Sequence, residues 1–458
     1  EWNMKTKKAD LTKDPILWSI LVFAVPIFIS NAFQQLYNTA DTMIVGNVLG
    51  DKSLAAIGAA GAVYELLVGF SVGVGNGFSL VIGRYYGAGD EDMVKRSAAG
   101  SMVIGAGIVL GIMAASMLGM KPLLILLDTP SNIFEETYSY IIIIAMFAGV
   151  MFLYNLLSGC LRAIGNSLMP LIFLIISSVI NVGLDLIFLK QFRMEVQGTA
   201  VATVIAQAVS AILCMLYIYK KAPILVPGRK HFKIEGNLYG ELAGQGFSMG
   251  CMMAIVSDGT IILQKSINGF GYLIIAGHTT ARKINSFCMM PCSALALAIS
   301  NFVSQNFGAG KKDRILKVIK IGSAASIIWG AAAAVIMLLS AEKLAALISG
   351  SSQPEVLRNA AKYLMINAPF YSVLGILLIL RNSLQGIGKK VVPLISSGIE
   401  FFGKIIFVIA CIPVLGYFGV ILCEPVIWCF MCVQLLFAFY RDPYITGGRG
   451  NMVKFREK

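Results

Sequence analysis

The sequence predicts an all-α integral membrane protein in which about twelve transmembrane helices form two six-helix lobes. Three observations lead to this fold class: an apolar composition, a series of long apolar runs and an internal repeat. Of the 458 residues, 57% are hydrophobic and only 13% are charged. Soluble globular domains are about 45–50% apolar and about 25% charged. So little polar surface remains to face water that lipid must be the solvent for much of the chain.

Twelve apolar runs are long enough to cross a bilayer as helices, because each contains roughly 18 residues or more. They lie at about residues 16–38, 54–82, 97–120, 137–160, 168–189, 199–219, 242–267, 273–305, 316–340, 361–384, 393–414 and 418–440. Because the number of runs is even, we expect both termini on the same side of the membrane.

Lysine and arginine residues indicate the orientation. If the amino terminus is cytoplasmic, 26 of the 37 basic residues fall in cytoplasmic segments, 7 fall on the opposite side and 4 lie inside predicted spans. Cytoplasmic loops carry an excess of basic residues, so this asymmetry predicts that both termini are cytoplasmic. The net charge of +13 is therefore explained by membrane topology, and we expect no nucleic-acid partner.

An internal repeat divides the chain into two similar halves. The segment Tyr86–Asp92 recurs as Phe307–Asp313, and its Gly-Ala-Gly pattern predicts tight turns that end helices on the cytoplasmic side. Leu161–Gly165 recurs as Leu384–Gly388 in nearly the same register. Two six-helix halves in parallel order predict a pseudo-two-fold axis along the membrane normal. That arrangement is typical of alternating-access carriers with a substrate cavity between the halves.

The repeat predicts four parts of the chain. An N-terminal six-helix lobe covers residues 15–219, and a cytoplasmic linker, rich in lysine and interrupted by proline and glycine, covers 220–236. A C-terminal six-helix lobe covers 237–442, and a cytoplasmic tail covers 443–458.

Several kinds of enzyme are excluded by missing motifs. The residues before Lys311 fail the phosphate-binding loop pattern, because Gln305 stands in place of its first glycine and Lys312 in place of its serine or threonine. Two histidines and nine scattered cysteines give neither a metal-binding spacing nor a disulfide framework. We therefore expect no enzyme activity and no cofactor, and an ion gradient remains as the energy source.

Ionisable residues inside the spans of the first half are the candidate functional residues. A charged side chain is costly in lipid and faces a cavity or a partner. Asp41 lies in the first span and Asp185 in the fifth, where Asn181 precedes it by one helical turn. Thr203 and Gln207 are also one turn apart in the sixth span. Such carboxylate, amide and hydroxyl oxygens suit a proton or a hard cation such as Na⁺ at Asp41, Asn181 and Asp185. The alternative is that Asn181 and Thr203 only hydrogen-bond neighbouring helices.

The first span also carries polar side chains and a proline. Gln34, Tyr37 and Asn38 are spaced to lie on one helix face, and we expect them to line a substrate cavity together with Gln207. Pro26 removes a helical hydrogen bond and would let the span bend as a hinge. A static kink at Pro26 is the alternative.

The second half has its own ionisable residues inside spans, and we expect them to contribute to the same substrate cavity. They are Asp258, Lys265, His278, Arg282, Glu400 and Lys404, with Glu424 in the last span. Glu400 and Lys404 are one turn apart, so a self-neutralising ion pair is an equally good interpretation. Asp258 and Lys265 share a helix face and could pair in the same way.

An ordered set of motifs runs through both halves. It consists of Gln34–Asp41, Ala55–Gly58, the Gly-Ala-Gly loops at 87–89 and 308–310, Leu161–Gly165, Asn181–Asp185 and Gly198–Thr203. With these motifs, nearly the whole chain resembles the multidrug and toxic compound extrusion (MATE) family, bacterial type. In one branch of that family the tenth span holds a carboxylate that belongs to a cation site of the second lobe. The corresponding run here has no carboxylate, so the resemblance does not imply a cation site in the second lobe.

The resemblance implies a secondary antiporter that exports cationic amphipathic compounds in exchange for H⁺ or Na⁺ by alternating access. It also implies that Asp41, Asn181, Asp185 and Thr203 form a cation site in the first lobe. The expected partners are small organic cations and membrane lipid. The protein is expected to be a monomer in the bacterial cytoplasmic membrane.

Two other functions stay open at this point. A flippase for a lipid or lipid-linked precursor has a related architecture, but it should show a wide basic cavity for a pyrophosphate. A membrane-embedded enzyme would need a cluster of metal-binding Asp or His residues at a helix end, and the sequence has no such cluster.

Overall fold

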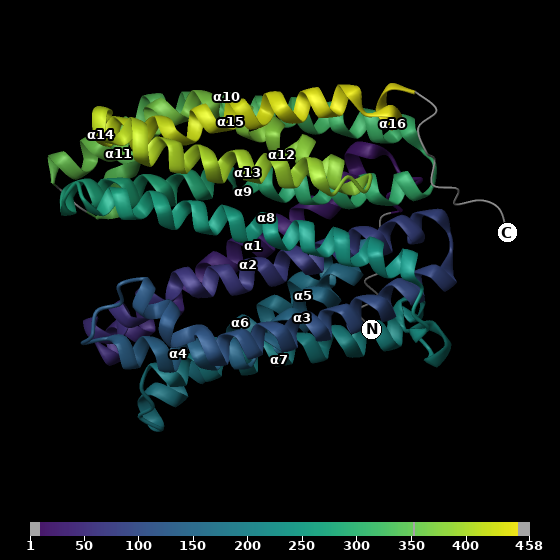
Figure 1. Ribbon diagram of the computed structural model, residues 1–458, viewed down its shortest axis with the longest axis horizontal. Helices are drawn as coiled ribbons and strands as arrows, with labels where there is room; N and C mark the ends of the chain where they lie inside the picture. Colours follow the sequence, from purple (N-terminus) through teal and green to yellow (C-terminus); the bar gives the residue numbers. More distant parts are fainter. Residues whose placement is uncertain (1–9, 351–352, 448–458) are drawn as a thin grey trace, which may run out of the picture. The chain divides into compact units, whose positions relative to one another are not determined.

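The computed structural model in Figure 1 describes residues 10–350 and 353–447, apart from the side chains of Asp258 and Thr260. All regular elements within these ranges are helices. Those of the first half are α1 (Ile16–Leu49), α2 (Asp51–Ala88), α3 (Glu91–Leu126), α4 (Phe134–Met146), α5 (Ala148–Ala163), α6 (Leu168–Leu186) and α7 (Val196–Lys221). Those that follow are α8 (Gly236–Asn268), α9 (Tyr272–Gly308), α10 (Lys312–Ser349), α11 (Pro354–Asn367), α12 (Tyr371–Gly386), α13 (Val391–Ile406), α14 (Ile412–Leu415), α15 (Tyr417–Arg441) and α16 (Pro443–Thr446).

The predicted transmembrane character is confirmed. Within the described ranges, 11 helical segments are long and apolar enough to span a membrane, and the bent pair α4 and α5 raises the number to 12. Each predicted run falls inside one of these segments. The fourth span was predicted as one straight helix, but it bends by 48° between Met146 and Ala148. Gly149 lies directly beyond the bend, but a single glycine in an apolar helical run does not by itself predict a break.

The two halves interrupt their helices at matching places, as the repeat predicts. The bend of the fourth span at Phe147 corresponds to a short 3₁₀ segment, Ala368–Phe370, inside the tenth. A π-helical segment, Ile187–Gln191, follows α6, and another, Phe407–Cys411, follows α13. These paired irregularities support the repeat from backbone geometry, independently of the sequence motifs.

The predicted glycine turns are only partly correct. Gly89 and Gly310 have φ values of 77° and 69°, in the left-handed region where glycine is favoured, and they follow the ends of α2 and α9. Gly87 and Gly308 are instead still helical, within the last turns of α2 and α9. The second glycine of each pair therefore makes the turn.

The chain divides into two compact units. The first contains residues 10–14 and 21–254, and the second contains residues 15–20 and 255–447. Each unit therefore receives a segment of a helix that continues into the other, since α1 and α8 both cross a boundary.

Inside the first unit, α2 and the amino-terminal part of α8 cross at glycines. A Cβ added to Gly77 would lie 2.6 Å from the carbonyl oxygen of Gln245 and 2.7 Å from the Cα of Gly246. Gly73 is equally close to Gly250, whose Cα would lie 2.8 Å from a Cβ at Gly73. Because these neighbours are backbone atoms, the crossing requires residues without side chains.

We expect Gly77→Ala to destabilise the first unit by about 1–3 kcal/mol, because the added methyl group must push two helix backbones apart. Gly107→Ala in α3 is the matched control, since a Cβ there meets nothing within 4 Å. Thermal unfolding of the purified variants would compare them. Equal Tm values for both variants would contradict a close crossing of α2 and α8.

Candidate functional site

The first unit brings four of the predicted site residues together from three helices. Asp41 projects from α1, Asn181 and Asp185 from α6, and Thr203 from α7. The Nδ2 of Asn181 donates a long hydrogen bond of 3.5 Å to the Oγ1 of Thr203. The carboxyl groups of Asp41 and Asp185 are close enough to interact electrostatically. Residues from the first and the last span of the first half therefore share one small region of the structure.

Local helix geometry explains how α6 presents its two polar side chains. Asn181 and Asp185 are four residues apart and so lie on the same face of the helix. The π-helical segment Ile187–Gln191 begins two residues after Asp185. Such wide turns occur frequently at functional sites, because they redirect the side chains around them. No sequence pattern indicates this π-helical segment.

Burial without hydrogen bonding distinguishes this cluster from an ordinary interhelical contact. Asp185 is 0% exposed and Asn181 is 2% exposed. Among the described residues no N–H or hydroxyl group donates a hydrogen bond to either carboxylate oxygen of Asp185, to Oδ1 of Asp41 or to Oδ1 of Asn181. The carboxyl of Asp41 lies next to that of Asp185, and the two can share a hydrogen bond only when one of them is protonated. A buried carboxylate without a partner is costly, so such groups occur where a proton or a cation completes them.

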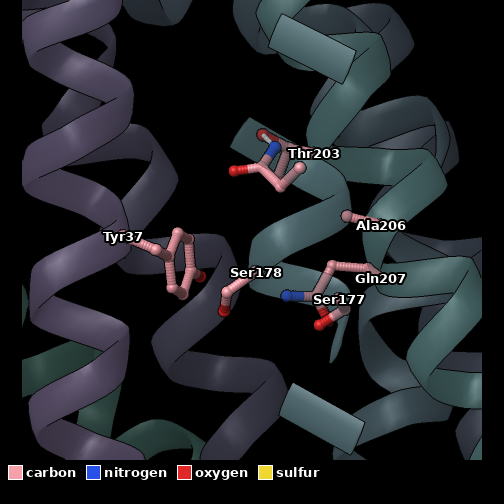
Figure 2. Close-up of a pocket in the computed structure, with 7 residues that line it drawn as sticks. Tyr37, Ser177, Ser178, Thr203, Ala206 and Gln207 are labelled. Carbon is pink, nitrogen blue, oxygen red and sulfur yellow. Dashed lines mark hydrogen bonds between the residues drawn. The ribbon is translucent and has the colours of Figure 1, made fainter. Parts of the chain in front are cut away.

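A small pocket opens beside the cluster, as Figure 2 shows. It is lined by Tyr37, Ser177, Ser178, Asn181, Thr203, Ala206 and Gln207. Tyr37 points from α1 across the pocket toward the side chains of α6 and α7. The empty space is about 200 Å³ even when its solvent-open part is included. Ligand pockets for organic molecules measure about 300–1,000 Å³, so this pocket fits water or a small ion.

The polar residues of α1 take different positions around the pocket. The Tyr37 hydroxyl lies near the side-chain amides of Gln34 and Gln207, so these three form one group. Asn38 is exposed, and its backbone carbonyl accepts a 2.8 Å hydrogen bond from Thr42. Of the predicted set, Tyr37 and Gln207 line this pocket, whereas Gln34 and Asn38 do not.

Two tyrosines near the carboxylates were missed by the sequence analysis. Tyr64 of α2 lies near Asp41, and Tyr140 of α4 lies near both Asp41 and Asp185. Tyr140 is 5% exposed and belongs to an apolar core cluster that also contains Val63, Ile141 and Val204. Tyrosine is so common in helical cores that its identity alone gave no signal.

Pro26 is buried within α1, which runs on as one helix to Leu49. The hydroxyl of Ser30 donates a 2.8 Å hydrogen bond to the Pro26 carbonyl. The hinge role of Pro26 stays a prediction.

The second unit places its predicted residues in two ion-paired groups. Lys404 Nζ lies 2.9 Å from Glu400 Oε1, as expected for a self-neutralising pair. Arg282 pairs with Glu424. His278 is 4% exposed, and its Nδ1 lies 3.4 Å from the Tyr417 hydroxyl.

The expected ion pair between Asp258 and Lys265 in the second unit stays a prediction. Lys265 is exposed, and it has no ion-pair partner among the described side chains. The side chain of its expected partner, Asp258, lies outside the described residues. Among the residues described, no three His, Cys, Asp or Glu side chains gather as a metal centre would require.

Comparison with known proteins identifies the family. The MatE family model matches residues 26–187 and again residues 249–410. The chain belongs to the MatE family. The two matched segments align in the same register as the motifs Leu161–Gly165 and Leu384–Gly388, so the family model finds the same repeat. Members of this family are membrane transporters and not enzymes, so this chain is a multi-pass membrane transporter.

Similar proteins are known at the level of sequence and of fold. The probable multidrug resistance protein YoeA of Bacillus subtilis is 27% identical, over 93% of this chain and 94% of its own length. An FAD transporter of Shewanella oneidensis is 23% identical, over 84% of this chain and 86% of its own length. A crystal structure of a MATE protein in the bent conformation matches with a TM-score of 0.87 and 21% identity, covering 96% of this chain and 99% of that one. A structure in the straight conformation matches with a TM-score of 0.86 and 20% identity, covering the same shares.

Proposed function

We propose that this transporter is a secondary antiporter that exports cationic amphipathic compounds in exchange for H⁺ or Na⁺. The observation that carries the proposal is Asp185, a fully buried carboxylate to whose oxygens no N–H or hydroxyl group of the described residues donates a hydrogen bond. A second carboxylate, Asp41, lies next to it. Two neighbouring carboxylates repel each other when both are ionised, so they hold a proton or a monovalent cation strongly.

The pocket beside the carboxylates favours a small ion over an organic compound. All of its lining residues except Ala206 carry a hydroxyl or amide side chain, and its volume is below that of a drug-binding cavity. Asn181 and Thr203 add two oxygens to those of Asp185, which suits Na⁺ as well as a proton. The coupling ion therefore binds in the first unit, and the organic substrate binds elsewhere in the transporter.

Coupling between ion and substrate follows from charge and from the hinge. Uptake of the ion removes negative charge near α1, which weakens the attraction for an organic cation. It also lets α1 bend at Pro26, where a helical hydrogen bond is missing. Related MATE proteins adopt bent and straight conformations, and the multidrug relative YoeA supports the substrate class. We place the protein as a monomer in the bacterial cytoplasmic membrane, with both termini in the cytoplasm.

The flippase alternative is less well supported. A flippase for a pyrophosphate-linked lipid needs free basic side chains in its cavity. Two of the basic residues predicted for the cavity, Arg282 and Lys404, are paired with Glu424 and Glu400. Their charge is therefore largely neutralised before any anionic ligand binds.

Flux measurements in vesicles test the proposed function. Purified protein in liposomes should move ethidium against its concentration gradient when a proton gradient or a sodium gradient is imposed, and not when both are absent. Protein-free liposomes are the control. Movement of a labelled lipid across the bilayer without any ethidium flux under either gradient would contradict antiport and support the flippase.

A further inference from the structure

A cluster of polar residues in the second unit occupies the position that corresponds, in the repeat, to the cluster of Asp41, Asn181, Asp185 and Thr203 in the first. The register that aligns Gly87 with Gly308 also aligns Thr203 with Glu424. The register that aligns Leu161–Gly165 with Leu384–Gly388 also aligns Tyr140 with Tyr363 and Asn181 with Lys404. Their helices correspond in order as well, since Tyr363 lies on α11, Lys404 on α13 and Glu424 on α15.

These corresponding residues also meet in space. The Tyr363 hydroxyl donates a 2.7 Å hydrogen bond to Glu424 Oε2. Lys404 lies within electrostatic range of the same carboxylate. The ring of His278 packs edge-on against Tyr363 at 5.1 Å between centroids. The second unit thus assembles its own buried polar cluster around Glu424, and Lys404 also pairs with Glu400 at its edge.

The two clusters differ in what balances their charge. The register of Gly87 and Gly308 aligns Asp41 with Ile262, and the register of Leu161 and Leu384 aligns Asp185 with Val408. Both carboxylates of the first cluster are therefore replaced by apolar residues. Glu424 is the carboxylate that Tyr363 and Arg282 contact in the second cluster. Arg282 pairs with its Oε1. In the register of Gly87 and Gly308, Arg282 corresponds to Gly61 of the first unit. The first unit therefore has no basic side chain at this position, and a Cβ added to Gly61 would meet nothing within 4 Å.

We propose that the Arg282 guanidinium is a tethered cation that permanently fills the second unit's counterpart of the ion site. This inference rests on the proposed function for the exchangeable ion of the first unit. A guanidinium stays charged at every physiological pH and offers several donors in a fixed plane. Glu424 and Tyr363 therefore satisfy a cation that cannot leave, and the transporter carries one exchangeable ion site, in the first unit.

The proposal predicts that Arg282 can be replaced by a free cation. The Arg282 side chain is 32% exposed, so a small solute can reach the space it leaves, whereas the Glu424 side chain is 8% exposed. Arg282→Ala should lower Tm, because it leaves a buried carboxylate without its cation. Millimolar methylguanidinium should then raise Tm in a saturable way and recover most of the loss.

Three further variants make the titration specific. Arg282→Ala combined with Glu424→Gln should not respond to methylguanidinium, since the carboxylate that binds it is gone. Arg358→Ala, at an exposed arginine of α11 in the same unit, should not respond either. Asp41→Asn combined with Asp185→Asn should leave the response of the Arg282 variant unchanged. Failure of the proposed antiport in vesicles would not affect this readout, because it measures stability without transport.

A response of Arg282→Ala to sodium in place of methylguanidinium, abolished by Glu424→Gln, would equally support a cation position in the second unit. The absence of any response to either cation would overturn the proposal, as would a response that persists in the double variant. Should Arg282→Ala fail to fold, Arg282→Met keeps the aliphatic stem, and the same titration on it decides.

Discussion

Asp185→Asn and Asp41→Asn are each expected to abolish ion-driven ethidium export, reducing it to the leak rate of protein-free liposomes. Each change keeps the shape of the side chain but removes the carboxylate that exchanges the proton or binds the cation. Asp185 is the more completely buried of the two carboxylates, since its side chain is 0% exposed. Gradient-driven flux in liposomes is the measurement.

The stability of the same variants separates an ion site from a structural role. Two neighbouring carboxylates in a buried site destabilise the fold when both are ionised, so Asp185→Asn should leave Tm unchanged or raise it. Asp51→Asn, at an exposed aspartate that begins α2, is the matched control and should retain full transport. Full transport by Asp185→Asn under either gradient, or a large loss of Tm with loss of transport, would contradict the role of Asp185 in coupling.

Much of the fold could be predicted from the sequence because membrane spans depend on local composition. Lipid demands long apolar helices, and the twelve predicted runs all fall within helices of the structure. The repeat was also readable, since the landmark glycines Gly89 and Gly310 lie at the same turn of each half. The bend near Phe147 was not predicted, because the single glycine beside it, Gly149, is tolerated in many helices and does not by itself indicate a break.

The candidate site was only partly predictable for a related reason. Asp41 and Asp185 were selected because charge inside a span is unusual in any context. The neighbouring Tyr64 and Tyr140 are ordinary core residues by type, and only their placement next to the carboxylates makes them part of the site. The pairing of Arg282 with Glu424 joins residues 142 positions apart, which helical spacing cannot indicate. The helix-local pair of Glu400 and Lys404, in contrast, was one of the two interpretations that their spacing allowed.

The coupling ion and the organic cation are expected to weaken each other's binding. A ligand shifts a conformational equilibrium only by its differential affinity for the two states, so exchange requires that ion and substrate favour opposite states. Occupation of Asp41 and Asp185 lowers the negative charge that attracts an organic cation. By reciprocity the substrate lowers ion affinity by the same factor, and typical coupling free energies of about 1–3 kcal/mol correspond to a roughly 5- to 150-fold change.

The most direct test of this account is the affinity of the purified, unmodified protein for ethidium as the coupling ion is varied. Equilibrium binding should weaken either as pH falls from about 8 to about 5 or as sodium is added. Asp185→Asn should flatten that dependence. An ethidium affinity that stays constant across this pH range and across sodium concentrations would contradict coupling through the first-unit carboxylates.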